Sequence, residues 1–196
     1  PNPEVAGSGV EKLVAAGIPV TQLTDFDSLA RAVTPGYFKR REQGIPYVRC
    51  KLAMSLDGRT ALANGQGKWI SGLQSRSDVQ RLRAASGAVI TGIQTVLADD
   101  PSLNVRISDL NLHPEELARN ELSLSTQPLR VILDSQLRTP DTAKILTLPG
   151  EVKIFSIEPP DGAKNPASNV EYRQAAASGK RVSLHSVLES LASDFT

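Results

Sequence analysis

Three runs of consecutive apolar residues predict buried strands in the middle of the chain. They cover residues 88–93, residues 129–134 (LRVILD) and residues 152–156 (VKIFS). A continuous apolar run of this length is typical of a strand that is covered on both faces, as in a parallel sheet. A further short strand is expected at residues 181–184.

Residues 47–54 (YVRCKLAM) carry a different pattern, in which apolar residues at the even positions alternate with Tyr47, Arg49, Lys51 and Ala53. A period of two predicts a strand with one buried face. Val48, Cys50, Leu52 and Met54 are expected on that face. Lys51 is expected on the opposite face, where a lysine in a two-sided sheet needs a cleft or a charged partner.

Helical spacing predicts a helix over residues 72–86. The sequence SGLQ at 71–74 has the form of a capping box, and Gly87 stands where a glycine that ends a helix is expected. From Ser183 to Phe195, apolar residues recur at helical intervals and predict a second helix.

The first 44 residues are predicted to be mostly helical, and two polar or proline-rich stretches are predicted to be mobile loops. A capping-box pattern beginning at Ser8 marks the first helix. The expected helices are residues 9–16, 26–33 and 37–43, the expected strand is 18–23, and the expected loops are 108–127 and 157–169.

Alternating strands and helices favour an α/β domain with a largely parallel sheet, in which ligands bind beyond the carboxyl ends of the strands. The chain has 196 residues, with 22 Lys and Arg against 21 Asp and Glu. A net charge of +1 excludes nucleic-acid binding through bulk charge. No apolar run approaches the roughly 20 residues of a membrane span, so no membrane partner is expected.

The single cysteine, Cys50, excludes an internal disulfide and fits a reducing, cytoplasmic compartment. One cysteine with His113 and His185 cannot build a Cys/His zinc site, so no metal is expected. The chain starts at Pro1, its only methionine is Met54, and its last helical pattern has no terminating residue. We therefore expect a piece of a longer protein.

Three stretches are candidates for chemistry. They are KLAMSLDGRTA (51–61), KWIS (68–71) before a predicted helix, and TGIQTVLADDP (91–101), which leads toward Arg106. Each also has an ordinary structural explanation: an exposed strand lysine, a core tryptophan and a capped turn. Neither G-x-G-x-x-G nor G-x-x-x-x-G-K-[ST] occurs, so the two common phosphate-loop motifs do not apply.

Taken in order, KLAMSLDGR, GKWIS, TVLADDPSLNVR and LRVILDS resemble the reductase domain of the bifunctional riboflavin-biosynthesis deaminase–reductase family. The opening PNPEVAGSGVEKLVAAGIPV resembles the end of the deaminase domain of the same family. The resemblance covers essentially the whole chain, and four motifs in the same order make it specific.

The resemblance implies an α/β fold like that of dihydrofolate reductase, with a largely parallel sheet and flanking helices. It assigns residues 1–44 to the end of a cytidine-deaminase-like α/β domain and residues 45–196 to a C-terminally truncated reductase domain. The implied reaction is the NADPH-dependent reduction of the ribosyl group of 5-amino-6-(5-phosphoribosylamino)uracil to a ribityl chain. The family also deaminates the preceding pyrimidine with zinc.

The resemblance also implies site residues. Family positions that line the NADPH site correspond to Ala53, Trp69, Thr95, Asp99 and Ser135. Positions that line the substrate site correspond to Gly67, Arg83, Leu103 and Arg106. The family commonly has serine where Gly67 stands. Lys51 matches a lysine suspected of a catalytic role, and Lys51 or Asp99 is expected to assist proton movement as the sugar ring opens.

Two arginines among these residues suit a phosphate, because a guanidinium can bind it bidentately. Lys51 and Asp99 are expected to face each other across neighbouring strands. The deaminase signatures H-x-E and P-C-x-x-C do not occur, so zinc is expected only in the absent part of that domain. The family's later glycine-containing loop is also absent, so neither active site is expected to be complete.

Two other interpretations remain. One is a stand-alone dihydrofolate-reductase-like enzyme acting on another pyrimidine or a pteridine, which the deaminase-like tail at residues 1–44 disfavours. The other is a non-catalytic nucleotide-binding module, which the retention of Lys51, Trp69, Asp99 and Arg106 disfavours. Family members associate through the reductase domain, so a homo-oligomer is expected.

Overall fold

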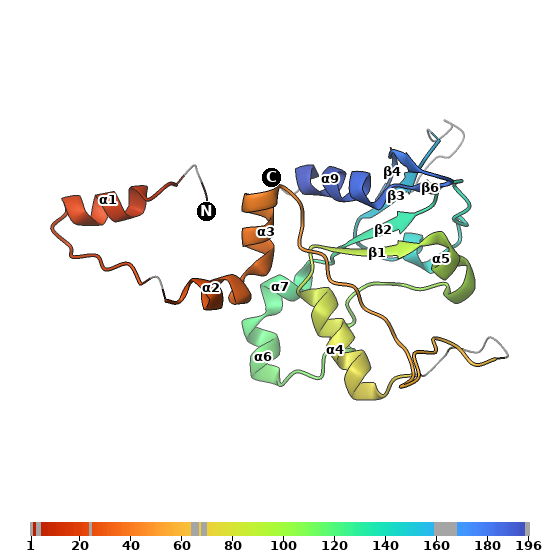
Figure 1. Ribbon diagram of the computed structural model, residues 1–196. Helices are drawn as coiled ribbons and strands as arrows, with labels where there is room; N and C mark the ends of the chain where they lie inside the picture. The colour runs from red at the N-terminus through yellow and green to blue at the C-terminus, as the bar shows by residue number, and fades with distance from the viewer. Residues whose placement is uncertain are drawn as a thin grey trace. The chain divides into compact units, whose positions relative to one another are not determined.

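The computed structural model of the chain describes residue 2 and residues 5–23, 25–63, 67, 70–158 and 168–194. It divides into two compact units. One unit is Lys51–Ser183, and the other combines Pro1–Cys50 with Leu184–Thr196. The expected α/β architecture with a parallel sheet is confirmed, and the sheet lies in the first of these units (Figure 1).

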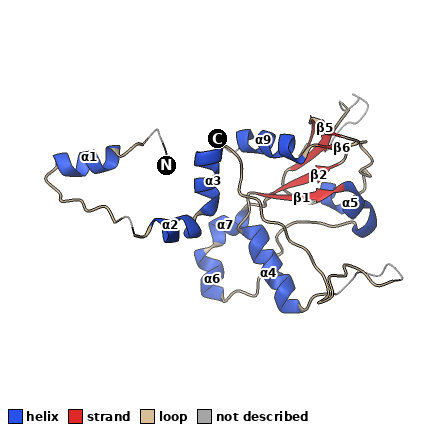
Figure 2. Ribbon diagram, viewed as in Figure 1, coloured by secondary structure: helices blue, strands red, loops and turns tan. Residues whose placement is uncertain are grey.

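Four parallel strands, labelled in Figure 1 and drawn red in Figure 2, form this sheet in the order β1-β2-β3-β4. Their bounds are Ala88–Gly92 for β1, Leu129–Leu133 for β2, Val152–Ser156 for β3 and Val170–Gln174 for β4. The three apolar runs therefore correspond to β1, β2 and β3. The expected strand at residues 181–184 is shorter, because only β6 (Arg181–Val182) forms there and pairs antiparallel with β5 (Ala177–Ser178).

The central strands are covered on both faces, as continuous apolar runs predict. All five residues of β3 and the first four of β2 are buried. Ile132 pairs with Ile154 in the register, and both side chains have no exposed surface. One cluster of buried hydrophobic residues forms the core around these strands. It comprises Ile93, Val96, Ile132, Ala143, Ile145, Leu146, Val152, Ile154 and Val170.

The helix predicted at residues 72–86 is α4 (Leu73–Ala84). Its N-cap is Gly72 and no side chain caps it, so the capping box expected at Ser71 is wrong. The Ser71 backbone carbonyl instead accepts a hydrogen bond from Arg76 Nη1 at 2.6 Å. The Arg76 side chain thus folds back onto the residues that precede the helix.

Short helices occupy the connections between strands. α5 (Ile93–Asp99) follows β1 directly, and α8 (Lys144–Thr147) lies between β2 and β3. The stretch predicted as a mobile loop at residues 108–127 instead contains most of the 3₁₀ helix η1 (Ile107–Asp109), α6 (Pro114–Arg119) and α7 (Glu121–Ser125). The second predicted loop lies largely outside the described residues.

The strand predicted at residues 47–54 is wrong, because these residues form no strand. Val48, Leu52 and Met54, which the alternation assigns to a buried face, are 52%, 64% and 50% exposed. A period of two marks a pleated surface that needs a neighbour, and an unpaired strand leaves its backbone groups unsatisfied. Among the strands that the structure describes, none pairs with this segment.

The second unit is helical in the described residues. It contains α1 (Ser8–Ala15), α2 (Asp27–Val33), α3 (Pro35–Gln43) and α9 (Leu184–Asp194), close to the predicted helices. The strand expected at residues 18–23 does not form. Gly7 in the left-handed conformation, not a serine, is the N-cap of α1, so the Ser8 capping box is also wrong.

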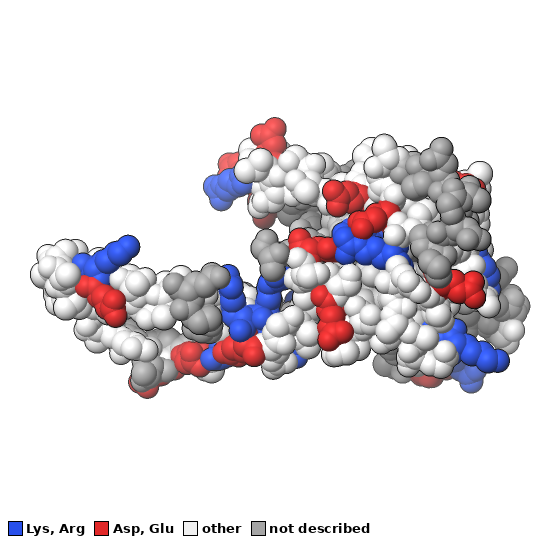
Figure 3. Space-filling model, turned by 90° about the horizontal axis from the view of Figure 1, so that it is seen from above, with Lys and Arg blue, Asp and Glu red and all other residues white. Residues whose placement is uncertain are grey.

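Charge and hydropathy add little to this architecture. On the face that Figure 3 shows, lysine and arginine side chains lie beside aspartate and glutamate side chains rather than in one continuous basic area. Within the described residues, no helix combines the length and the apolar character needed to cross a bilayer.

Candidate functional site

Polar groups gather at the carboxyl ends of the parallel strands. α5 begins at the residue after β1 (Figure 1). It carries Thr95 and Asp99 four positions apart, so both lie on one side of the helix. Both residues are exposed. The carboxyl edge of a parallel sheet is where open α/β folds bind nucleotides, because strand ends and helix starts meet there.

Ser135 lies at the same edge, two residues after β2. Its Oγ accepts a hydrogen bond from the Val182 backbone N–H at 3.0 Å, and its backbone carbonyl accepts one from Ile157 N–H at 3.4 Å. The side chain is therefore held by β6, and the backbone of Ser135 is held by the residue that follows β3. Its hydroxyl proton is not used in that bond and can be donated to a ligand.

Asp99 and Asp100 are adjacent carboxylates with different surroundings. Asp100 adopts a left-handed backbone with φ of 42° and accepts a hydrogen bond from the Lys144 backbone N–H at 2.8 Å. That bond, with a smaller contribution from the Lys144 ammonium group, lowers the pKa of Asp100. Asp100 thus caps α8, whereas Asp99 has no hydrogen-bond or ion-pair partner among the described residues.

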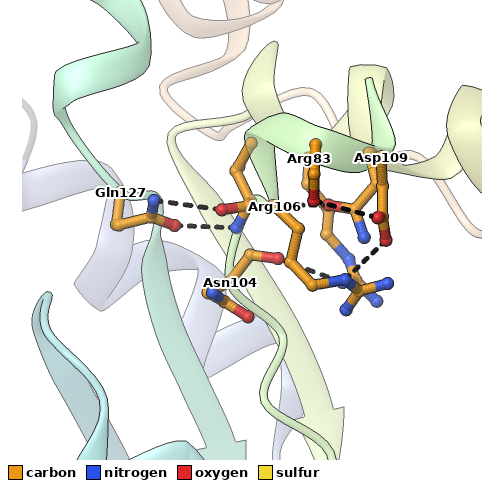
Figure 4. A network of polar contacts seen from close by, with 8 residues as sticks. Arg83, Asn104, Arg106, Asp109 and Gln127 are labelled. Atoms are coloured by element: carbon orange, nitrogen blue, oxygen red, sulfur yellow. Dashed lines mark hydrogen bonds and ion pairs between the residues drawn. The ribbon is translucent and has the colours of Figure 1, made fainter. Parts of the chain in front are cut away.

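The substrate-site arginines are brought together by α4 and the segment after α5. Arg83 lies in the last turn of α4, and its Nη1 donates a hydrogen bond to the Asn104 backbone carbonyl at 3.2 Å (Figure 4). Burial lowers the pKa of Arg83, and the positive charge of Arg106 lowers it further. Among the described residues, no carboxylate lies within ion-pair distance of Arg83.

Arg106 does have an acidic partner. Its Nε lies 2.6 Å from Asp109 Oδ2, and both side chains are substantially exposed, at 45% and 39%. The hydrogen bond from Arg106 is the main cause of a lowered pKa at Asp109. Two guanidinium groups with one carboxylate leave a net positive charge, and this arrangement favours an anion such as a phosphate.

The two groups of predicted residues lie at different ends of the sheet. Gln127 lies two residues before β2. The oxygen and the nitrogen of its side-chain amide both form hydrogen bonds with the backbone of Val105. Arg106 is therefore near the amino end of β2, whereas Thr95 and Ser135 follow the carboxyl ends of β1 and β2. A five-residue strand spans about 13 Å, so one ligand that contacts both groups must be elongated.

Other predicted residues are less closely placed. Lys51 is exposed, lies on no strand and forms no ion pair with Asp99 within the described part of the chain, so the expected pairing across strands is wrong. Its predicted position on the face opposite Val48 depended on that strand. Ala53 is half-buried in the same irregular segment.

Gly67 is exposed, and a Cβ at this position would lie 3.0 Å from the Thr60 carbonyl oxygen. Trp69, the expected flat wall of the NADPH site, lies outside the described residues. Leu103 is half-buried and packs against the core. Within the described residues, no group of three His, Cys, Asp or Glu side chains is arranged to hold a metal ion.

Sequence reasoning missed three polar residues around the arginines: Gln80, Asp109 and Gln127. The spacing of Asp109, three residues after Arg106, and of Gln80, three residues before Arg83 on a helix, were available signals. Gln127 lies in a polar stretch whose composition predicts a loop, and no local pattern distinguishes it.

Comparison with known proteins gives a consistent result. A family model described as the RibD C-terminal domain matches residues 46–194. "Riboflavin biosynthesis protein RibD" of Haemophilus influenzae is 48% identical over 162 residues, covering 82% of this chain and 42% of the relative. The protein of the same name from Escherichia coli is 45% identical over 156 residues, covering 77% of this chain and 40% of the relative.

Solved structures agree with these relatives. Acinetobacter baumannii RibD, form 1, superposes with a TM-score of 0.73 at 42% identity, covering 99% of this chain and 49% of that one. A Thermotoga maritima protein described as a diaminohydroxyphosphoribosylaminopyrimidine deaminase/5-amino-6-(5-phosphoribosylamino)uracil reductase gives a TM-score of 0.76 at 28% identity, covering 99% and 48%. The chain thus spans less than half the length of these proteins.

Proposed function

The chain belongs to the RibD C-terminal domain family, and we propose that it forms most of the reductase portion of a bifunctional deaminase–reductase of riboflavin biosynthesis. The proposed reaction reduces the ribosyl group of 5-amino-6-(5-phosphoribosylamino)uracil to a ribityl chain. The observation that carries the proposal is the arginine pair, Arg83 and Arg106, which has more positive charge than Asp109, its carboxylate partner within the described part of the chain, neutralises.

The pair suits the phosphate of this substrate. Phosphate is a dianion near neutral pH, and planar guanidinium groups bind it through paired, charge-assisted hydrogen bonds. Arg83 is held by α4 and Arg106 by the segment that follows α5, so two separate elements converge on the anion. The phosphate end of the substrate is then placed near the amino ends of the strands, with Leu103 and Gly67 as further lining residues.

NADPH fits the opposite, carboxyl edge. Ser135 offers a fixed hydroxyl there, Thr95 offers an exposed hydroxyl, and Ala53 and Trp69 are proposed to complete the site. When bound, NADPH supplies the hydride, and the protein supplies orientation and charge. An elongated substrate that reaches from the arginines toward this edge brings its ribosyl group near the cofactor site.

Asp99 is proposed to move or hold a proton as the ribosyl ring opens. Its carboxylate is exposed at the same edge as Thr95, and Asp100 rather than Asp99 takes the structural role of capping α8. Lys51 is proposed as a second proton-handling group. Its support is the family resemblance alone, because the structure gives it no partner within the described residues.

The remaining features of the proposed protein concern its other parts. Residues 1–44 are proposed to be the end of a zinc-dependent deaminase domain whose metal ligands lie outside this chain. The protein is proposed to associate into a homo-oligomer through the reductase domain and to act in the cytoplasm on a small molecule.

Substitution of Arg106 tests the proposal. A charge-assisted hydrogen bond contributes roughly 1.5–3 kcal/mol, so Arg106→Ala in the full-length protein should lower kcat/KM about 10- to 150-fold. The loss should shrink with a dephosphorylated substrate. If the variant prefers the phosphorylated substrate as strongly as the wild type does, the arginine pair does not bind the phosphate and the proposal loses its main support.

A further inference from the structure

The segment that carries Arg106 is held by side chains from two sides. From α4, Gln80 Oε1 accepts a hydrogen bond from the Arg106 backbone N–H at 3.0 Å. From the residues before β2, Gln127 Oε1 accepts one from Val105 N–H at 2.7 Å, and Gln127 Nε2 donates one to the Val105 carbonyl at 3.2 Å (Figure 4). Two glutamines thus satisfy three backbone groups of two consecutive residues.

These contacts are sheltered from water. Gln80 is 1% exposed and Val105 is 5% exposed, and Gln127 is half-buried. Backbone groups at buried positions need partners, and here side chains take the place of a helix or a strand neighbour. The contacts therefore define the path of the backbone where no regular secondary structure does.

The same segment contains an unfavourable backbone conformation. Leu103 has φ of 52°, in the left-handed region that a branched, bulky side chain rarely adopts. Such strain persists only where the surroundings enforce it, and it is frequent at ligand sites. Leu103 itself packs against the core, and the glutamine contacts hold the two residues Val105 and Arg106 that follow shortly after it.

We propose that Gln127 and Gln80 are positioning residues for substrate binding: they fix the backbone of Val105 and Arg106 so that the Arg106 guanidinium meets the substrate phosphate beside Arg83. The proposal rests on the proposed function, because it takes the phosphate to be the ligand of Arg106. Neither glutamine touches the substrate in this arrangement. Their effect passes through the position of Arg106.

Gln127 gives the sharper test, since its amide makes both bonds to one residue. Gln127→Met keeps the length of the side chain and removes both hydrogen bonds. Gln127→Glu keeps the shape and the acceptor for Val105 N–H, but sets a carboxylate against the Val105 carbonyl. Gln74→Met is the matched control, because Gln74 is an exposed glutamine of α4 that has no hydrogen-bond partner among the described residues.

Steady-state kinetics of the full-length variants, with phosphorylated and dephosphorylated substrate, provide the readout. For the phosphorylated substrate we expect KM to rise about tenfold, equivalent to about 1.4 kcal/mol, with kcat changed less than about twofold. KM for the dephosphorylated substrate should stay unchanged, and Gln74→Met should behave as the wild type. In the Arg106→Ala background, Gln127→Met should add no further loss, because there is no guanidinium left to position.

The outcomes separate this inference from the proposed function. If Arg106→Ala removes phosphate discrimination and Gln127→Met does not weaken it, only the positioning role is refuted. Additive losses in the double variant refute it as well. If Arg106→Ala leaves discrimination intact, the phosphate site itself is wrong. Failure of both Gln127 variants to fold, judged by thermal melting, would make Gln127 a structural residue and would also overturn the inference.

Discussion

Arg83 is the residue whose replacement should separate ligand binding from stability. It is a half-buried cation that makes a single hydrogen bond among the residues that the structure describes. That bond runs from Nη1 to the Asn104 carbonyl, and its length of 3.2 Å is at the long end of the range for such bonds. Its neighbour Arg106 has the same charge. The folded protein therefore holds Arg83 at a cost, and the phosphate is proposed to recover that cost on binding.

The sign of the stability effect follows from the pKa. Burial, and then the charge of Arg106, lower the pKa of Arg83 below its ordinary value. A base with a lower pKa in the folded state disfavours folding at every pH where it is protonated in both states. At pH 7 the whole of this penalty is present, and Arg83→Met removes it while keeping an apolar stem of similar reach.

The expected result is a loss of binding without a loss of stability. The lost phosphate bond contributes roughly 1.5–3 kcal/mol, which corresponds to about 10- to 150-fold in kcat/KM for the phosphorylated substrate. For a folding unit of about 150–250 residues, 1 kcal/mol shifts Tm by about 2–4 °C. We expect the Tm of Arg83→Met to be no lower than about 2 °C below that of the wild type, and to be equal or higher if the penalty is fully relieved.

The assay combines thermal melting with kinetics on phosphorylated and dephosphorylated substrates. Arg81→Met is the control, since Arg81 is exposed on the same helix and has no ion pair among the described residues. A drop in Tm of several degrees, together with equal losses for both substrates, would show that Arg83 supports the Asn104 segment rather than the phosphate. That result would refute the phosphate-binding role of Arg83.

Three further predictions concern the cofactor, the lysine and a glycine. We expect the full-length protein to prefer NADPH to NADH, and equal kcat/KM for the two would contradict this. If Lys51 transfers a proton, Lys51→Ala and Lys51→Arg should both lower kcat. Recovery of kcat in Lys51→Arg would indicate a charge or orienting role. An unchanged kcat and KM in Lys51→Ala would mean that Lys51 has no role in the reaction. Gly150→Ala should lower the free energy of unfolding by about 1–3 kcal/mol, because φ is +101° and the new Cβ would lie 3.0 Å from Gln127 Cβ. Thermal melting measures this loss against the control Gly9→Ala, where a Cβ meets nothing within 4 Å. Equal Tm values for the two variants would contradict the prediction.

The sequence predicted the sheet where hydrophobic burial alone decides the structure. Residues 152–156 match β3 residue for residue, and 129–134 match β2 to within one residue, because both strands are buried on both faces. β4 was missed, since VEYRQ has one strongly apolar residue and only Val170 in it is buried. Its strand conformation comes from pairing with β3, which no local pattern reveals.

Local sequence patterns gave wrong predictions in some segments and no prediction in others. Residues 47–54 have the alternation of a half-buried strand, yet the described chain supplies no neighbour for them. Both capping boxes were misassigned because a glycine precedes each helix and no side chain caps it. Short helices such as α5 and α8 contain too few turns for a period to be recognised.

The candidate site was predicted through resemblance rather than through periodicity. Motif order identified Arg83 and Arg106, and the structure brings them together beside Asp109. Gln80 and Gln127 were not identified, because their partners are backbone groups 26 and 22 residues away. Side-chain bonds to a distant backbone leave no signature in residue spacing.

The order of the strands has a consequence for how the sheet forms during synthesis. Each of these strands pairs with the strand before it in the chain. The paired residues Ala88 and Leu129 of β1 and β2 are 41 positions apart. The separation falls to 22 positions between Arg130 and Val152 of β2 and β3, and to 18 between Val152 and Val170 of β3 and β4. Closing the loop between β1 and β2 therefore has the largest entropic cost, about 0.7 kcal/mol more than closing the loop between β3 and β4. At a rate of chain synthesis of roughly 5–20 residues per second, β2 is synthesised on the order of 2–8 s after β1. For strands that pair in the order of their synthesis, β3 and β4 each meet an edge that is already formed, so this strand order allows the sheet to grow in one direction, one strand at a time.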